Sequence, residues 1–299
     1  VLKIDSLGVI QWQRCYGGSH FDYGGFIQQT TDGGYVIGGH SNSWDGDVTV
    51  NHGSLDIWVV KIDSSGNIQL QKSFGSAYDE FCYSIKQTPD NGYIAIGYTF
   101  GNVPDFHGGQ DVYVVKLSST GDLQWEKAYG GSNDEFGRDI INTLDGGYIF
   151  TGTTSSQDGD VSGSTKNKTT SDDVWLTKLS SAGTIEWQKT YGGSGTDNGN
   201  SILNTNDSGY IIGGYTQSND GDVTDNHGKS DAWILKIASN KTIQWQKCAG
   251  GSNFDGANSI VENKTGNYTF AGTSGSSDGD CTHNYGKGDV WVASVTALS

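Results

Sequence analysis

The chain has 299 residues, enough for one large all-β domain or two ordinary ones. It contains 46 Gly but only 2 Pro, and aromatic residues make up 11% of it. This composition excludes collagen, because no Gly-X-Y period is present, and disfavours a disordered chain. The formal net charge of −16 disfavours nucleic acid and anionic membranes as partners. The sequence contains no run of about 18 apolar residues, so it predicts no membrane-spanning helix. The chain contains no Met, so we expect a processed form or a fragment of a longer protein.

An internal repeat dominates the sequence. One anchor is an isoleucine that follows an acidic residue by five positions and precedes a Tyr by eight; it recurs as Ile27, Ile85, Ile140, Ile202 and Ile260. A second anchor is an aromatic residue, found as Trp58, Tyr113, Trp175, Trp233 and Trp291. From each aromatic anchor to the next Ile the distance is 27 residues, whereas the distance from Ile to aromatic varies. All length variation therefore lies in one loop of the unit.

Each unit contains four predicted strands, A to D. Strand A is short, as in residues 84–88, and a tight Asp-Gly turn such as residues 31–34 follows it. Strand B covers 34–41 in the first unit, and strand C covers 58–63 after the variable loop. Strand D, as in 185–192, alternates Ile, Trp and Tyr with Gln and Lys, which is typical of a strand with one wet face.

Repeated units of four antiparallel strands predict a β-propeller, most simply one of five blades closed by strands from both termini. The alternatives are six or more blades, if the chain is a fragment, and a solenoid, which would need polar caps. The expected single domain covers 1–299, and residues 1–23 would supply strand D of the last blade. A C-like strand at 1–4 is then surplus. The units are 24–81, 82–136, 137–198, 199–256 and 257–299.

The unit resembles a propeller-like repeat that is common in secreted proteins of Bacteroidota. The pattern that carries the resemblance is GGSxxDExxxSIxxTxDGGYIIxGxT, then SxDGDVTxNHGxxDxWVVKL, then SSGxIxWQKxYGG, and it covers essentially the whole chain. Such proteins often carry a C-terminal type IX secretion sorting domain. The resemblance implies a secreted or cell-surface protein with a recognition, adhesive or scaffolding role, and it implies no catalytic residues.

The variable loop is rich in acids, as in SNDGDVTDNHGKSDAW at 218–233. In a propeller the B–C loops and the D–A links emerge on the same face, so these acids share that face. Carboxylates around a glycine are compatible with calcium, although the EF-hand spacing is missing. The other interpretation is architectural, with Asp side chains capping backbone amides. The candidate calcium ligands are Asp45, Asp47, Asp158, Asp160, Asp220, Asp222, Asp278 and Asp280.

Aromatic residues that break the repeat pattern are candidates for ligand contact. Trp44 lies in the first acidic loop, where the other units have small polar residues. Tyr78, Phe106 and Phe254 are expected on the same face and could join it in contacting a sugar or a protein. The Trp residues of strands C and D are instead expected in the core between blades. The histidines His52, His107 and His227 recur at one loop position, where loop packing is expected rather than zinc binding.

The composition argues against an enzyme. With only two arginines, Arg14 and Arg138, a sialidase-like arginine triad cannot be built. No unique pair of acids stands out for glycosidase chemistry, because most acids recur in every unit. Of the four cysteines, Cys15 and Cys248 share a repeat position; they could meet where a ring closes, but free buried thiols are expected. Two functions remain: a surface module that binds glycan or protein, and a structural scaffold or assembly subunit. A polysaccharide-acting enzyme is a distant third.

Overall fold

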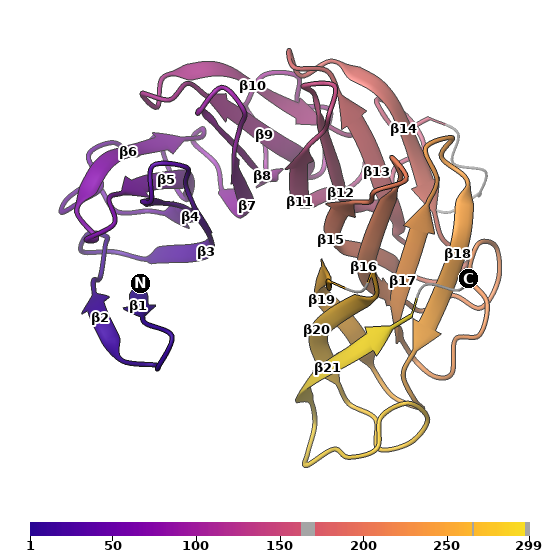
Figure 1. Cartoon of the computed structure of the whole chain (residues 1–299). Helices are drawn as coiled ribbons and strands as arrows, with labels where there is room; N and C mark the ends of the chain where they lie inside the picture. Colours follow the sequence, from indigo (N-terminus) through magenta and orange to yellow (C-terminus); the bar gives the residue numbers. More distant parts are fainter. Residues whose placement is uncertain (163–170, 265, 297–299) are drawn as a thin grey trace. The chain divides into compact units, whose positions relative to one another are not determined.

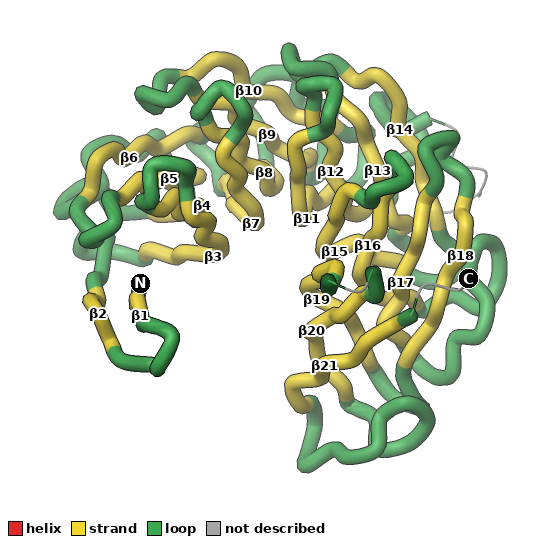
Figure 2. Tube along the Cα trace, viewed as in Figure 1, coloured by secondary structure: helices red, strands yellow, loops and turns green. Residues whose placement is uncertain are grey.

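The computed structural model describes residues 1–162, 171–264 and 266–296, and every regular element within them is a β-strand (Figure 2). Over the same residues, no helix has the length and hydrophobicity that crossing a membrane would require. The chain divides into two compact units, Val1–Gly130 and Gly131–Ser299, which are described separately below as unit 1 and unit 2.

Unit 1 contains a two-stranded hairpin and two four-stranded antiparallel sheets (Figure 1). The hairpin is formed by β1 (Leu2–Ile4) and β2 (Ile10–Gln13). The first sheet, in spatial order, contains β3 (Asp22–Gln29), β4 (Tyr35–Ser41), β5 (Asp56–Ile62) and β6 (Ile68–Phe74). The second contains β7 (Glu80–Gln87), β8 (Tyr93–Thr99), β9 (Asp111–Leu117) and β10 (Leu123–Tyr129).

Unit 2 repeats this arrangement in two four-stranded sheets and one three-stranded sheet. The first contains β11 (Glu135–Asn142), β12 (Tyr148–Thr154), β13 (Asp173–Leu179) and β14 (Ile185–Tyr191). The second contains β15 (Asp197–Asn204), β16 (Tyr210–Thr216), β17 (Asp231–Ile237) and β18 (Ile243–Ala249). The last contains β19 (Asp255–Glu262), β20 (Tyr268–Ser274) and β21 (Asp289–Val295).

The predicted class is confirmed: the protein is built from repeated propeller-type blades of antiparallel strands. Strands A to D are the first to fourth strands of each complete sheet, and strand A begins two residues before each expected unit, at Asp22 rather than residue 24, for example. The strand pairing differs from the predicted closure. The last sheet has three strands, and β2, its expected fourth strand, pairs with β1 instead. The grouping of all repeats into a single domain stays a prediction.

Strands A and B are joined by turns that hold a buried lysine. In the first sheet, Asp32 accepts hydrogen bonds from the Thr30 hydroxyl (2.5 Å) and the Gly34 N–H (3.0 Å), which closes the turn. The Lys61 ammonium on β5, only 4% exposed, lies 2.9 Å from Asp32. The same lysine–aspartate pair occurs in every complete sheet, as Lys116–Asp90, Lys178–Asp145 and Lys236–Asp207. In each complete sheet, the positive charge of the buried lysine is therefore compensated by an aspartate.

The core of each unit lies between successive sheets. In unit 1, Ile85 on β7 is fully buried and packs against the β4 backbone at Gly38, where an added methyl group would approach it to 2.9 Å. In unit 2, Ile260 makes the equivalent contact with Gly213. Four of the five strand C aromatics are buried as expected, and Trp175 and Trp233 are no more than 1% exposed, whereas Trp291 is half-buried. The Trp residues of strand D are half-buried.

The four cysteines form no disulfide, as the sequence indicated. Cys82, Cys248 and Cys281 are buried. Cys248 is buried as expected, but Cys15 is exposed, contrary to expectation, because it follows the end of the short strand β2 rather than lying inside a complete sheet.

Candidate functional site

The acidic loops are tied to the links between strands D and A by hydrogen bonds. Asp45 accepts from the N–H of Ser19 (2.7 Å), and Asp47 accepts from the N–H of Gly17 (3.1 Å). The amide of Ser19 lowers the pKa of Asp45. Equivalent bonds to link amides are made by Asp158, Asp220, Asp222, Asp278 and Asp280. The architectural role expected for these acids is therefore present in both units.

The aspartate that begins strand C has a second architectural role. Asp56 accepts hydrogen bonds from the backbone N–H (2.8 Å) and the Nδ1 atom (2.7 Å) of His52. Asp111 with His107 and Asp231 with His227 repeat the pattern. Burial raises the pKa of Asp56, and the bonds from His52 oppose that shift. The recurring histidines thus pack the loops, as expected.

Calcium binding by the loop acids stays a prediction. Over the residues whose positions are described, no three His, Cys, Asp or Glu side chains are grouped so that they could hold a metal ion. Asp160 lies in the third acidic loop, most of which (163–170) falls outside those residues. One carboxylate oxygen of Asp45 and one of Asp47 accept backbone hydrogen bonds.

The four predicted contact aromatics differ in their surroundings. Trp44 is 64% exposed and lies against the ring of His20, with centroids 4.1 Å apart. Tyr78 is also exposed, whereas Phe106 packs against the core of unit 1. Phe254 belongs to unit 2, where it is 58% exposed and lies beneath the ammonium of Lys229.

A continuous row of aromatic rings runs across both sheets of unit 1. It begins on the first sheet, where Tyr23 and His40 are cross-strand partners with centroids 4.9 Å apart. His40 then meets Phe81 of the second sheet at 4.8 Å, and Phe81 stacks on Tyr98 at 4.8 Å and 14°. We call this row the aromatic strip; its members are Phe21, Tyr23, His40, Phe81, Tyr83, Tyr98 and Phe100.

The aromatic strip lies at the surface, at the ends of the sheets where the acidic loops emerge. Phe21 is 55% exposed, Tyr23 48% and Phe100 42%. Strand alternation explains the position: Asp22 and Glu80 point toward the loop network, so the next residue of each strand, Tyr23 or Phe81, points to the opposite side. Contiguous exposed apolar patches of this kind often mark interaction sites.

His40 is the buried polar member of the strip. Its side chain is 7% exposed, and its Nδ1 atom has no hydrogen-bond partner in the part of the chain that the structure describes. Burial lowers the pKa of His40, and the nearby charge of Asp79 opposes that shift. A neutral imidazole between aromatic rings leaves the strip uncharged at neutral pH.

The register positions of the strip hold different residues in unit 2. The positions equivalent to Tyr98 and His40 are Thr153, Tyr215 and Thr273, and those equivalent to Phe81 are Phe136, Asn198 and Gly256. The sequence did contain this signal, because the aromatic residues concentrate in the first two repeats at these register positions. These positions lie in strands A and B, whereas most exceptions to the repeat that predict ligand contact lie in the loops and links.

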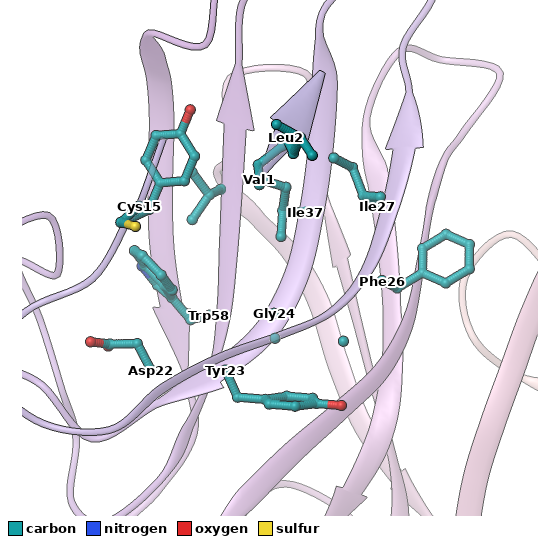
Figure 3. Close-up of a pocket in the computed structure, with 14 residues that line it drawn as sticks. Val1, Leu2, Cys15, Asp22, Tyr23, Gly24, Phe26, Ile27, Ile37 and Trp58 are labelled. Carbon is teal, nitrogen blue, oxygen red and sulfur yellow. The ribbon is translucent and has the colours of Figure 1, made fainter. Parts of the chain in front are cut away.

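Unit 1 also contains a cavity of about 480 Å³ between the β1–β2 hairpin and the first sheet (Figure 3). Its lining is mostly apolar and includes Val1, Leu2, Ile27, Ile37 and Trp58. Asp22 lies at its edge but is engaged with Ser41 and Ser43. The cavity therefore offers packing surface rather than a set of catalytic groups.

No protein-family model and no curated protein matches this chain. Solved structures do resemble it. One is a protein of unknown function from Bacteroides caccae, with a TM-score of 0.48 and 11% identity over 82% of this chain and 73% of that one. Another, from Bifidobacterium bifidum S17, is provisionally named an exo-beta-1,3-galactanase; its TM-score is 0.42 and its identity 11%, over 100% of this chain and 92% of that one. Likenesses of this size carry no functional argument.

Proposed function

We propose that this protein is a recognition module of the cell exterior or cell surface that binds glycan through the aromatic strip of unit 1. The observation that carries the proposal is the unbroken row of rings from Tyr23 to Tyr98, at the end of the sheets where the acidic loops emerge. Sugar rings present faces of weakly positive C–H groups, and the negative face of an aromatic ring attracts them.

The composition of the strip favours glycan over other ligands. A net charge of −16 opposes nucleic acid, whose bases also stack on aromatic rings. The strip also has polar groups within reach, since its Tyr hydroxyls and the carboxylate of Asp79 near His40 can hydrogen-bond to sugar hydroxyls. Tyr and Phe have few rotatable bonds, so holding them in place costs little conformational entropy.

Binding to an array of neutral and acidic oligosaccharides, followed by titration calorimetry with the best neutral hexasaccharide, tests the proposal. We expect saturable binding that Phe81→Asn weakens at least tenfold, because Asn198 occupies that register position in unit 2. Tyr285→Ala is the matched control, an exposed aromatic outside the strip, and should leave the affinity unchanged. Failure of every oligosaccharide to bind, or equal losses in both variants, would refute the proposal.

The same binding experiment, repeated with a chelator and with added calcium, tests the calcium prediction. If the acidic loops hold a cation that positions the ligand, then chelation should weaken glycan binding and added calcium should restore it. If chelation has no effect, the acids keep only the amide-capping role that their hydrogen bonds support. A protein partner captured by the strip in place of a sugar would replace glycan as the ligand.

A scaffold or assembly role is the second candidate function. The observation that favours it is the repeated network in which loop aspartates accept hydrogen bonds from link amides in both units. This observation is independent of the aromatic strip.

A further inference from the structure

His40, the buried member of the aromatic strip, has ring nitrogens without a partner. The side chain is 7% exposed, and its Nδ1 atom is buried without a hydrogen bond. The Nε2 atom likewise forms no hydrogen bond with any residue that the structure describes. Buried polar groups are normally paired, because an unpaired one loses its hydration without a replacement. The imidazole therefore carries hydrogen-bonding capacity that the folded chain leaves unused.

Packing against aromatic rings, rather than hydrogen bonding, fixes the imidazole of His40. The Tyr23 ring stacks on it with centroids 4.9 Å apart and 27° between the planes, and the Phe81 ring meets it edge-on at 4.8 Å and 65°. Its cross-strand partners are Tyr23 on β3 and Ile57 on β5. Asp79, in the link before β7, is close enough for its charge to act on the imidazole. A ligand can thus bond the ring nitrogens without displacing a partner inside the protein.

The fold of the blade does not require histidine at this position. The residues at the same register position in the other sheets are Tyr98, Thr153, Tyr215 and Thr273. A phenol ring or a small hydroxyl side chain therefore satisfies the packing between strands A and B. Either would also avoid an unpaired nitrogen in apolar surroundings. The imidazole of His40 is thus best explained by a partner outside the chain.

The aromatic strip combines two kinds of contact that differ in how well they distinguish ligands. Stacking on aromatic rings holds a sugar but selects weakly, since many sugars have an apolar face. A buried hydrogen-bonding group selects strongly, because a ligand without the matching hydroxyl leaves that group unpaired. A neutral imidazole has one N–H donor and one nitrogen acceptor, and a sugar hydroxyl matches either. The rings are therefore suited to holding a sugar, and His40 to distinguishing its hydroxyls.

We propose that His40 is the specificity-determining residue of the glycan site and hydrogen-bonds one hydroxyl of the bound sugar between Tyr23 and Phe81. This inference rests on the proposed function, because the ligand is the glycan that the strip holds. The strip is open to solvent beside His40, since Phe81 is half-buried and Phe100 is 42% exposed. The χ2 torsion of histidine is broad and roughly two-fold, so a half-turn exchanges ring nitrogens and carbons within the same space. Either nitrogen thus meets the hydroxyl while the neighbouring rings stay in place.

The charges around His40 define the class of sugar. The carboxylate of Asp79 acts on the imidazole, and the whole chain has a net charge of −16. A carboxylate or sulfate on the sugar would be repelled, and repulsion of this kind is one way in which sites reject related ligands. The expected ligand is therefore a neutral glycan with a hydroxyl next to its apolar face.

The inference is tested by titration calorimetry of the full chain with the neutral hexasaccharide and with analogues that each have one hydroxyl replaced by hydrogen. We expect the wild type to bind one or more analogues at least tenfold more weakly than the parent, because His40 is then left unpaired. His40→Phe keeps an aromatic ring and removes both nitrogens. It should bind the parent at least tenfold more weakly, and it should bind the parent and those analogues within twofold of each other.

Three further variants separate hydrogen bonding from structure. His40→Gln supplies an amide donor and acceptor, so it should keep the selectivity and bind the parent within about fivefold of the wild type. His40→Thr, which introduces the residue of two equivalent positions, should lose affinity and selectivity as His40→Phe does, and it replaces that variant if His40→Phe does not fold. His283→Phe makes the same change at an exposed histidine of unit 2 and should alter neither property.

Thermal unfolding shows whether the lost affinity of His40→Phe comes from a damaged fold. This variant should unfold at or above the wild-type temperature, since an unpaired nitrogen has been removed from apolar surroundings. Stability equal to that of the wild type together with lost selectivity would support the role of His40 in binding. A lower unfolding temperature together with unchanged selectivity would show that His40 serves the fold instead.

This inference and the proposed function fail by different results. If Phe81→Asn leaves hexasaccharide binding unchanged, the strip is not the site and the proposed function is refuted. If Phe81→Asn weakens binding whereas His40→Phe retains both the affinity and the selectivity of the wild type, the role of His40 alone is overturned. Equal binding of every analogue by the wild type would overturn it as well.

Discussion

The ring of Tyr98 stacks on the ring of Phe81 with centroids 4.8 Å apart and an angle of 14° between their planes. The two residues are direct cross-strand partners on β7 and β8, so the backbone pairing itself fixes the stack. Phe81 also contacts His40 of the neighbouring sheet, which joins the rings of two sheets into one surface. Rigid strands, rather than loops, therefore position the candidate site in unit 1.

Two substitutions of Tyr98 distinguish the contribution of ring stacking from that of hydrogen bonding. Tyr98→Phe keeps the ring and removes only the hydroxyl, so the affinity for the neutral hexasaccharide should fall by no more than about threefold. Tyr98→Thr places the residue of the equivalent position Thr153 there, and the affinity should fall at least tenfold because a stacking surface is lost. Titration calorimetry on both variants checks this. A larger loss of affinity in Tyr98→Phe than in Tyr98→Thr would mean that the ring does not stack on the sugar.

His40 makes the stability of unit 1 depend on pH near neutrality. Burial lowers its pKa in the folded protein, so the unfolded chain binds the proton more readily. Stability from the neutral imidazole is therefore present above the unfolded pKa of about 6.5 and is lost as the pH falls through and below it. The difference in unfolding free energy between wild type and His40→Thr should shrink from pH 7.5 to 5.5. Urea unfolding of both proteins at the two pH values measures this difference. A difference that grows on acidification would contradict a lowered pKa of His40.

The sequence predicted the repeat, the four strands of each blade and the loop face because these depend on local patterns. Asp-Gly turns, alternating strand D residues and the constant 27-residue spacing are all visible in one chain. The aromatic strip was not predicted, since its rings come from two blades and adjoin only after His40 meets Phe81. The closure was wrong for a related reason. The pattern of residues 10–16 identified a fourth strand but could not decide between β1 and β21 as its partner.

Asp32 stabilises the first sheet through the buried Lys61. The Thr30 hydroxyl, and after it Lys61, lower the pKa of Asp32 to about 2. Its stabilising effect is therefore complete above the unfolded pKa of about 4 and is lost as the pH falls toward 2. At pH 6, Asp32→Asn should cost about 1–2 kcal/mol, a modest value because the carboxylate is half exposed and screened by water. The exposed Glu262 provides a control as Glu262→Gln, which should be neutral. A cost that persists at pH 2 would show that charge is not the cause.

Gly97 shows the closest backbone approach in the blade of β7 to β10. A methyl group added at Gly97 would lie 1.6 Å from the carbonyl oxygen of Phe81, at the point where the pairing of β7 and β8 changes register. No rotamer change can relieve a clash with backbone, so the strands must separate. Gly97→Ala should therefore lower the free energy of unfolding by about 3 kcal/mol, at the upper end of overpacking costs. Gly286→Ala, with nothing within 4 Å of the added methyl group, is the control and should change it by less than about 0.5 kcal/mol. Because Phe81 belongs to the aromatic strip, the Gly97 variant should also weaken glycan binding, whereas Gly286→Ala should not. Thermal unfolding and calorimetry on the two variants measure both effects, and equal behaviour of the pair would show that this close approach does not constrain the blade.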